Sequence, residues 1–331
     1  MLGFGFRSPP TYENLRCCNQ QSGLNLNSDS ERQITRGALY AAFAYLLWGL
    51  FPVYFKAVAH VPALEVLAHR MLWSLLFVGL LLAVMRRWSW LAQVADARVL
   101  LRFFASAIAV SANWGIYIWA VAAGHIVDAS LGYFINPLVN VLIGTLFFAE
   151  RMRPAQWTAV ALAALGVAWL TWQAGELPWI GLSLAALFAA YGWLRKTASL
   201  GAIEGLALET ALLTPLALAY LIWLAFSGSS AFVSGSIGTE ALLMLAGPVT
   251  ALPLLFFAAG ARRIPFSMLG MIQYIAPTLQ LLIGVWLYHE PFAAEKAAGY
   301  VLIWIALAVF TVEAWLRMRA ESIATITPGA A

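Results

Sequence analysis

The sequence predicts an all-α integral membrane protein in which ten transmembrane helices form two inverted repeats of five helices each. Three observations support this fold class. The 331 residues are 63% hydrophobic and 10% charged, whereas soluble proteins carry about a quarter charged residues. Apolar segments long enough to cross a bilayer follow one another along the chain. The two halves of the chain also resemble each other when one is shifted by 140 positions.

Each spanning helix needs about 20 mostly apolar residues to cross the hydrocarbon core. This length predicts spans over residues 38–58, 64–85, 100–123, 128–149, 155–173, 177–195, 203–226, 240–260, 266–288 and 296–316. All but three of the 19 lysines and arginines lie in the two tails or in every second connection and its edges. Basic residues stay on the cytoplasmic side, so we expect both termini in the cytoplasm.

Identical residues at matching places carry the repeat. The shift of 140 aligns Pro137, Leu142, Ile143, Gly144 and Glu150 with Pro277, Leu282, Ile283, Gly284 and Glu290, and Lys56 with Lys196. It pairs spans that cross the bilayer in opposite directions, as in the inverted repeats of secondary transporters. We therefore predict a disordered cytoplasmic tail (1–36), a first repeat (37–176), a second repeat (177–316) and a cytoplasmic C-terminal tail (317–331).

Several other classes of protein are disfavoured. The isoelectric point near 9.2 does not indicate nucleic-acid binding, because the basic residues are scattered rather than gathered in one stripe. Cys17 and Cys18, the only cysteines, lie in the polar tail and fit neither a disulfide framework nor a zinc site. The sequence has no GxSxG, HExxH or P-loop motif. We predict no metal, no cofactor and no enzymatic activity, and we predict no particular oligomeric state.

Three stretches of the sequence resemble a known family. They are GLFPVYFKAVAHVPALEVLAHR (Gly49–Arg70), SLGYFINPLVN (Ser130–Asn140) and QYIAPTLQLLIG (Gln273–Gly284). They are similar to the RarD proteins, often labelled chloramphenicol-sensitive proteins, a branch of the EamA-type transporters in the drug/metabolite transporter superfamily. The resemblance covers nearly everything after residue 36, whereas the polar tail has no counterpart in the family pattern. It implies a ten-helix carrier of the bacterial inner membrane built from two EamA-like repeats, and it defines no substrate.

Paired prolines indicate where a substrate site could lie. Pro137 and Pro277 fall near the middle of the fourth and ninth predicted spans. A proline inside a helix removes a backbone hydrogen bond and kinks the helix, and matched interruptions in two repeats point to the site of a transporter. A passive packing kink is the alternative, because proline is common in membrane helices.

Polar and aromatic side chains within the spans complete the predicted substrate site. Polar groups in a membrane face the bundle interior, where they either join helices or meet a substrate. Tryptophan and tyrosine also fill cores and interfacial belts, so packing is the alternative for the aromatic members. The predicted substrate-binding residues are Trp48, Arg70, Asn113, Trp114, Tyr133, Asn136, Tyr191, Gln273 and Tyr274.

Ionisable residues inside spans suggest proton coupling. His69 and Glu209 occupy matching positions of the two repeats, and burial disfavours their charged forms, so their protonation can change during transport. Glu209 is the stronger candidate for proton exchange and His69 the weaker. Arg70 keeps its charge at ordinary pH. It could hold an anionic group of a substrate, pair with Glu65, or extend to the lipid headgroups.

The sequence predicts a secondary active transporter that exports a small metabolite or organic, drug-like solute by alternating access. The expected partners are the solute, the lipid bilayer and protons. Export as the direction rests on the family resemblance alone. The alternative is a membrane sensor or interaction protein, in which the polar groups only join helices. A cavity lined by Trp48, Asn136 and Gln273 would favour transport, and a solid core there would favour the alternative.

Overall fold

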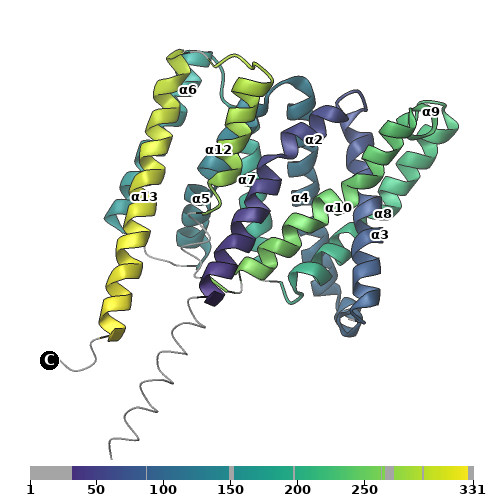
Figure 1. The fold of residues 1–331 in the computed structure, drawn as a ribbon, viewed down its shortest axis with the longest axis horizontal. Helices are drawn as coiled ribbons and strands as arrows, with labels where there is room; N and C mark the ends of the chain where they lie inside the picture. Colours follow the sequence, from purple (N-terminus) through teal and green to yellow (C-terminus); the bar gives the residue numbers. More distant parts are fainter. Residues whose placement is uncertain are drawn as a thin grey trace, which may run out of the picture.

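The computed structural model describes residues 32–86, 88–148, 153–196, 198–261, 263–264, 272–292 and 294–326. Within these ranges all regular structure is helical. Seven helices are long and apolar enough to cross a membrane, and the apolar helices Trp179–Arg195 and Ile275–Leu287 are shorter. The described chain is therefore an all-helical membrane protein, as predicted (Figure 1).

Helices lie at the places of the predicted spans, and most of their described ends, though not all, agree to within a few residues. The first helix, Arg32–Ala57, is divided by a turn at Leu50, after which it continues as α2 (Phe51–Ala57). The other spans correspond to α3 (Ala63–Val84), α4 (Ala97–Ala123), α5 (Ile126–Phe148), α6 (Pro154–Ala174), α7 (Trp179–Lys196), α8 (Ala202–Phe226), α10 (Ile237–Ala261), α12 (Ile275–Leu282) and α13 (Ala294–Ile326). The start of the predicted span 266–288 lies outside the described residues.

Local chemistry explains several helix ends. Asp96 caps α4, because its side chain accepts a hydrogen bond from the backbone N–H of Arg98 at 2.8 Å. The helix ends at Gly124, whose φ of 82° lies in the left-handed region that glycine adopts without strain. Gly175 ends α6 in the same way, with φ 69°. The short connection that follows Gly124 brings the start of α5 back beside the end of α4.

Short elements and helix extensions differ from the prediction. The 3₁₀ helix η1 (Ser89–Ala95), the one-turn helix α9 (Ala231–Ser234) and the π-helical turn η2 (Ile283–Leu287) were not predicted. Residues 32–36, predicted to be disordered, are helical, and α13 continues ten residues beyond the predicted end of the second repeat at 316. Residues 1–31, Glu150 and the side chains of Pro137, Asn140 and Lys196 lie outside the described part.

In two of the contacts between helices, the backbones approach each other closely at glycine residues. Helix α6 packs along α13 on the left of Figure 1, while α3 packs against α8 and α10 on the right. A Cβ atom added at Gly166 of α6 would lie 2.7 Å from the carbonyl oxygen of Gly299 on α13. Helix α5 approaches α7 through Gly132, where an added Cβ would lie 2.5 Å from the carbonyl oxygen of Gly181. Small residues of this kind let membrane helices pack backbone to backbone.

The distribution of polarity fits a lipid environment. Large apolar side chains such as Phe226, Ile237 and Trp172 point outward and are 89%, 84% and 79% exposed, whereas several ionisable side chains within the helices, including Glu65, Arg70 and Glu209, are buried. The first described helix begins, and α13 ends, at the lower edge of Figure 1, so both lie at the same end of the bundle. The polar side chains inside the bundle form the candidate site.

Candidate functional site

A buried arginine in the first half of α3 forms the centre of the candidate site. Arg70 of α3 is 2% exposed, and its Nε donates a hydrogen bond to Thr250 Oγ1 of α10 at 2.8 Å. Its Cζ lies 3.1 Å from the centroid of the Trp114 ring on α4, a close cation–π contact. Arg70 therefore points into the bundle and does not extend to the lipid headgroups. We call its surroundings the Arg70 cage, formed by Arg70, Phe51, Phe55, Trp114, Tyr117, Tyr133 and Thr250.

The partners of Arg70 within the cage are neutral. No carboxylate of the described residues lies within ion-pair distance of its guanidinium. Glu65, five residues earlier on α3 and the alternative partner, is fully buried and binds the start of α9 instead. Its Oε1 accepts hydrogen bonds from Ser230 Oγ at 3.1 Å and from the N–H of Ala231 at 2.8 Å. The predicted pairing of Arg70 with Glu65 is therefore absent from this structure.

A chain of hydrogen bonds continues from the cage toward α7. Tyr133 of α5 donates to Asn113 Oδ1 at 3.5 Å, and Asn113 Nδ2 donates to the carbonyl oxygen of Leu184 on α7 at 2.9 Å. Asn113 is fully buried, so this amide joins α4, α5 and α7. The structure thus brings four predicted substrate residues together: Arg70, Asn113, Trp114 and Tyr133.

Glu209 forms a second polar cluster, with partners that the sequence did not reveal. Glu209 of α8 is 2% exposed, and its Oε1 accepts a hydrogen bond from Ser106 Oγ of α4 at 2.5 Å. Arg195 Nη1 of α7 lies 3.8 Å from the same oxygen, and Tyr191 lies beside the carboxylate. Ser106 and Trp114 are eight residues apart on α4, which places the two clusters about 12 Å apart along the helix axis at 1.5 Å per residue.

The remaining predicted site residues lie outside these two clusters. His69 faces α9, with its ring 4.8 Å from that of Phe232, and neither ring nitrogen has a hydrogen-bond partner among the described residues. Trp48 packs against Tyr45 and Phe257. Asn136 is 5% exposed, and its Oδ1 has no partner within the described ranges.

The helix around Pro277 differs from the predicted kink. A turn at Gln273–Tyr274 precedes α12, so Pro277 is the third residue of that helix rather than an interior one. Proline is tolerated in the first turn of a helix, because the N–H groups there have no hydrogen-bond partner within the helix. Pro137 does lie inside α5. Gln280 of α12 donates from Nε2 to the carbonyl oxygen of Trp48 at 3.1 Å, which joins α12 to the first helix.

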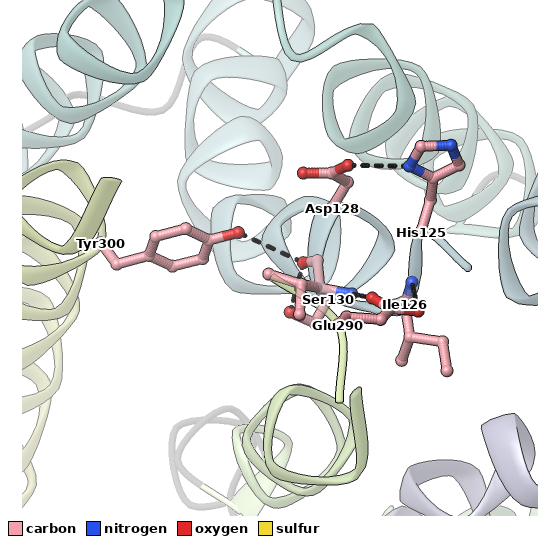
Figure 2. Close-up of polar contacts among 7 residues, drawn as sticks. His125, Ile126, Asp128, Ser130, Glu290 and Tyr300 are labelled. Carbon is pink, nitrogen blue, oxygen red and sulfur yellow. Dashed lines mark hydrogen bonds and ion pairs between the residues drawn. The ribbon is translucent and has the colours of Figure 1, made fainter. Parts of the chain in front are cut away.

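A carboxylate from the second half caps a helix of the first half. Figure 2 shows Glu290 below the first turn of α5, with its oxygens accepting hydrogen bonds from the N–H of Ile126 at 2.9 Å and of Val127 at 2.8 Å. Tyr300 of α13 donates to the carbonyl oxygen of Val127 at 3.3 Å. A carboxylate at this position also interacts favourably with the helix dipole. We call this contact the Glu290 latch, formed by Glu290, Ile126 and Val127.

Two pockets of the described residues lie away from the predicted cavity. A pocket of about 230 Å³ lies between the start of α4 and the loop before α8, and it is lined by Asp96, Arg98, Val99, Arg102, Phe103, Ala198 and Ser199. Neither this pocket nor a smaller one beside α3 involves Trp48, Asn136 or Gln273. Arg70 itself is 2% exposed, and neither pocket reaches it. The described part of the chain contains no group of three metal-binding side chains.

Sequence reasoning missed Thr250, Ser106 and Arg195, which contact the predicted residues. Thr250 lies 180 positions from Arg70, and Ser106 lies 103 positions from Glu209. No spacing pattern connects such distant residues. Arg195 lies in the last turn of α7, and its side chain reaches the carboxylate of Glu209.

Comparison with known proteins identifies relatives over most of the chain. The EamA-like transporter family matches residues 35–172. An uncharacterized transporter of Pseudomonas aeruginosa is 44% identical over 289 residues, covering 86% of this chain and 96% of the relative. Protein RarD of Escherichia coli is 42% identical over 292 residues, covering 88% and 99%. One crystal structure shares the fold with a TM-score of 0.53 and 21% identity, covering 85% of this chain and 98% of its own.

Proposed function

The chain belongs to the RarD proteins of the EamA-like transporter family and is a bacterial membrane transporter, and we propose that it acts as a secondary carrier by alternating access. In this proposal ten helices form two inverted five-helix repeats, residues 37–176 and 177–316. The protein lies in the inner membrane, with both termini in the cytoplasm. It exports a small metabolite or organic solute.

Helix contacts support the inverted repeats. Helices related by the 140-residue shift pack against each other in three places within the described residues: α3 against α8, α6 against α13, and α5 against α12. Contacts between other helices also occur in pairs that the shift relates. The contact of α3 with α10 corresponds to that of α8 with α4, and the contact of α5 with α7 corresponds to that of α12 with the first helix. This pattern is expected when a two-fold axis relates the halves. The name of the Pseudomonas aeruginosa relative, an uncharacterized transporter, also supports the proposed transport function.

The observation that carries the proposed mechanism is the Arg70 cage between the halves. Arg70 comes from the first predicted repeat and Thr250 from the second, so any rocking of one half against the other changes the surroundings of the guanidinium. Polar groups in a carrier are expected at such an interface near the midplane. The substrate-contacting residues in this proposal are Arg70, Asn113, Trp114 and Tyr133, with Trp48, Asn136, Tyr191, Gln273 and Tyr274 lining the path that opens.

Proton coupling belongs to the Glu209 cluster in this proposal. Ser106 and Arg195 stabilise the charged carboxylate, while burial in the bundle opposes it. A movement of α7 that withdraws Arg195 would therefore favour uptake of a proton by Glu209. His69, at the matching place of the first half, has no hydrogen-bond partner at either ring nitrogen within the described ranges and is the second candidate.

Reconstituted vesicles test the proposed function. Purified protein in liposomes is given a bacterial metabolite extract with and without an imposed proton gradient, and the vesicle contents are measured by mass spectrometry. We expect accumulation of a small set of compounds that requires the protein and increases with the gradient. No protein-dependent accumulation under either condition would contradict transport and favour a sensor or interaction protein.

A further inference from the structure

We propose that the Arg70 cage binds an anionic group, a carboxylate above all, so that the substrates are small organic anions; this inference rests on the proposed transport function. The reason is an imbalance of charge. A cation inside a membrane helix is costly and almost always has a partner. Within the described residues, Arg70 has a hydroxyl and aromatic rings around it but no anion.

The partners that Arg70 does have leave part of its binding capacity for a ligand. A guanidinium carries five N–H donors in one plane, and only Nε donates to a described protein group, Thr250 Oγ1. That hydroxyl in turn donates to the carbonyl oxygen of Ala246 at 2.8 Å, so its orientation is fixed. The contact with Thr250 holds the guanidinium plane in place. The edge formed by its two terminal nitrogens matches a carboxylate in the two-bond arrangement that arginine forms with such groups.

Tyr117 supplies a second, independent indication of a polar ligand. Its side chain is 2% exposed, it lies close to Arg70, and its hydroxyl has no hydrogen-bond partner among the described residues. Buried hydroxyls in proteins almost always find a partner. An oxygen of a bound carboxylate would accept the hydrogen bond from Tyr117 while it pairs with Arg70.

The carboxylate of Glu65 on the same helix already has partners. Glu65 lies five residues before Arg70 on α3 and accepts hydrogen bonds from the start of α9. The ring of Trp114 covers one face of the guanidinium and leaves its edge for a ligand, while the positive charge of Arg70 repels a second cation. The cage thus selects for a negatively charged group. The rings of Phe51, Phe55 and Tyr133 favour a ligand whose remaining part is apolar.

A fractionated metabolite extract tests the charge class. An extract is separated by anion exchange at neutral pH into an anionic fraction and a fraction of neutral and cationic compounds, and uptake from each fraction into proteoliposomes is measured. We expect protein-dependent uptake from the anionic fraction only. Uptake from the neutral and cationic fraction alone would overturn this inference and leave the transport function standing. No uptake from either would overturn both.

Three variants assign the effect to the cage. Arg70→Met should lower uptake from the anionic fraction at least about tenfold, because it removes the charge that pairs with a buried anion, and Arg70→Lys should keep part of it. Tyr117→Phe should lower uptake with no loss of thermal stability, since its hydroxyl bonds to no described protein group. Ser74→Ala, a buried change one turn along α3, is the control. Unchanged uptake by Tyr117→Phe and Arg70→Lys would contradict the inference even if Arg70→Met failed to fold.

Discussion

Glu209 combines the properties that a proton-exchanging carboxylate needs. It is buried among helices, accepts a hydrogen bond from Ser106, and has a cation, Arg195, at 3.8 Å rather than in tight contact. A loose ion pair of this kind can be broken by a small helix movement, whereas a tight one would hold the charge permanently. The depth of Glu209 could be predicted from its place in an apolar span. Its partners could not, because they come from helices whose packing the sequence does not encode locally.

Glu209→Gln should abolish uptake driven by a pH gradient while the protein stays folded. Glutamine keeps the volume and an oxygen that accepts the bond from Ser106, but it exchanges no proton. We expect solute exchange across vesicles without a gradient to continue. Glu204→Gln, in the first turn of the same helix, serves as the control. Gradient-driven uptake that equals the wild type would remove Glu209 from the mechanism.

Gly205→Ala should alter the same cluster without touching Glu209. An added Cβ would fall within the space of the Arg195 guanidinium, so the arginine must move away from the carboxylate. We expect the pH at which gradient-driven uptake is half-maximal to shift upward, because the carboxylate then loses a stabilising cation and holds its proton more firmly. Gly192→Ala on α7, where an added Cβ meets nothing within 4 Å, should leave this pH unchanged.

At the scale of helices, hydropathy predicts where the spanning helices lie, whereas contacts between distant helices determine where a helix is interrupted or a short helix is added. The spans over 64–85 and 203–226 agree with α3 and α8 to within one residue, because about 20 apolar residues must cross the bilayer. The π-helical turn at Ile283–Leu287 and the short α9 have no such signature. Both adjoin contacts with distant helices, namely the Glu290 latch and the bonds of Glu65, so they depend on the packed structure.

Gly166→Ala should destabilise the contact between α6 and α13. The new methyl group would lie 2.7 Å from a backbone carbonyl oxygen and 2.9 Å from a side-chain atom of Ile303. Such overpacking costs about 1–3 kcal/mol. Thermal unfolding of the purified protein in detergent measures the effect. Gly79→Ala on α3, which has open space around it, should be neutral or slightly stabilising, and equal losses from both changes would refute the packing argument.

Glu290→Ala should weaken the start of α5. It leaves two buried N–H groups, those of Ile126 and Val127, without their acceptor. Loss of a helix cap costs about 0.5–2 kcal/mol. Hydrogen exchange at these two amides should increase more than exchange in α6. Glu295→Ala, an exposed change at the start of α13, is the control. Unchanged protection at Ile126 and Val127 would show that the latch does not hold this helix end.

For the whole molecule, the decisive prediction concerns which connections share a side of the membrane. After replacement of Cys17 and Cys18 by serine, single cysteines at Arg86 and Arg263 should react with a membrane-impermeant reagent only from the cytoplasmic side. A cysteine at Gly175 should react only from outside. Labelling of positions 86 and 263 from opposite sides would contradict the inverted repeats. The alternation of charge predicted this arrangement, since lysine and arginine distribution sets orientation.

The length of α13 has a consequence for the aqueous side of the protein. Its 33 residues span about 50 Å at 1.5 Å per residue, whereas the hydrocarbon layer is about 30 Å thick. We therefore expect the last turns to project beyond the lipid at the end of the bundle where the first helix begins. A fluorescent tag joined after Ile326 would be held clear of the headgroups, and energy transfer from it to a membrane dye should rise when residues 318–326 are deleted, because the tag then lies closer to the lipid.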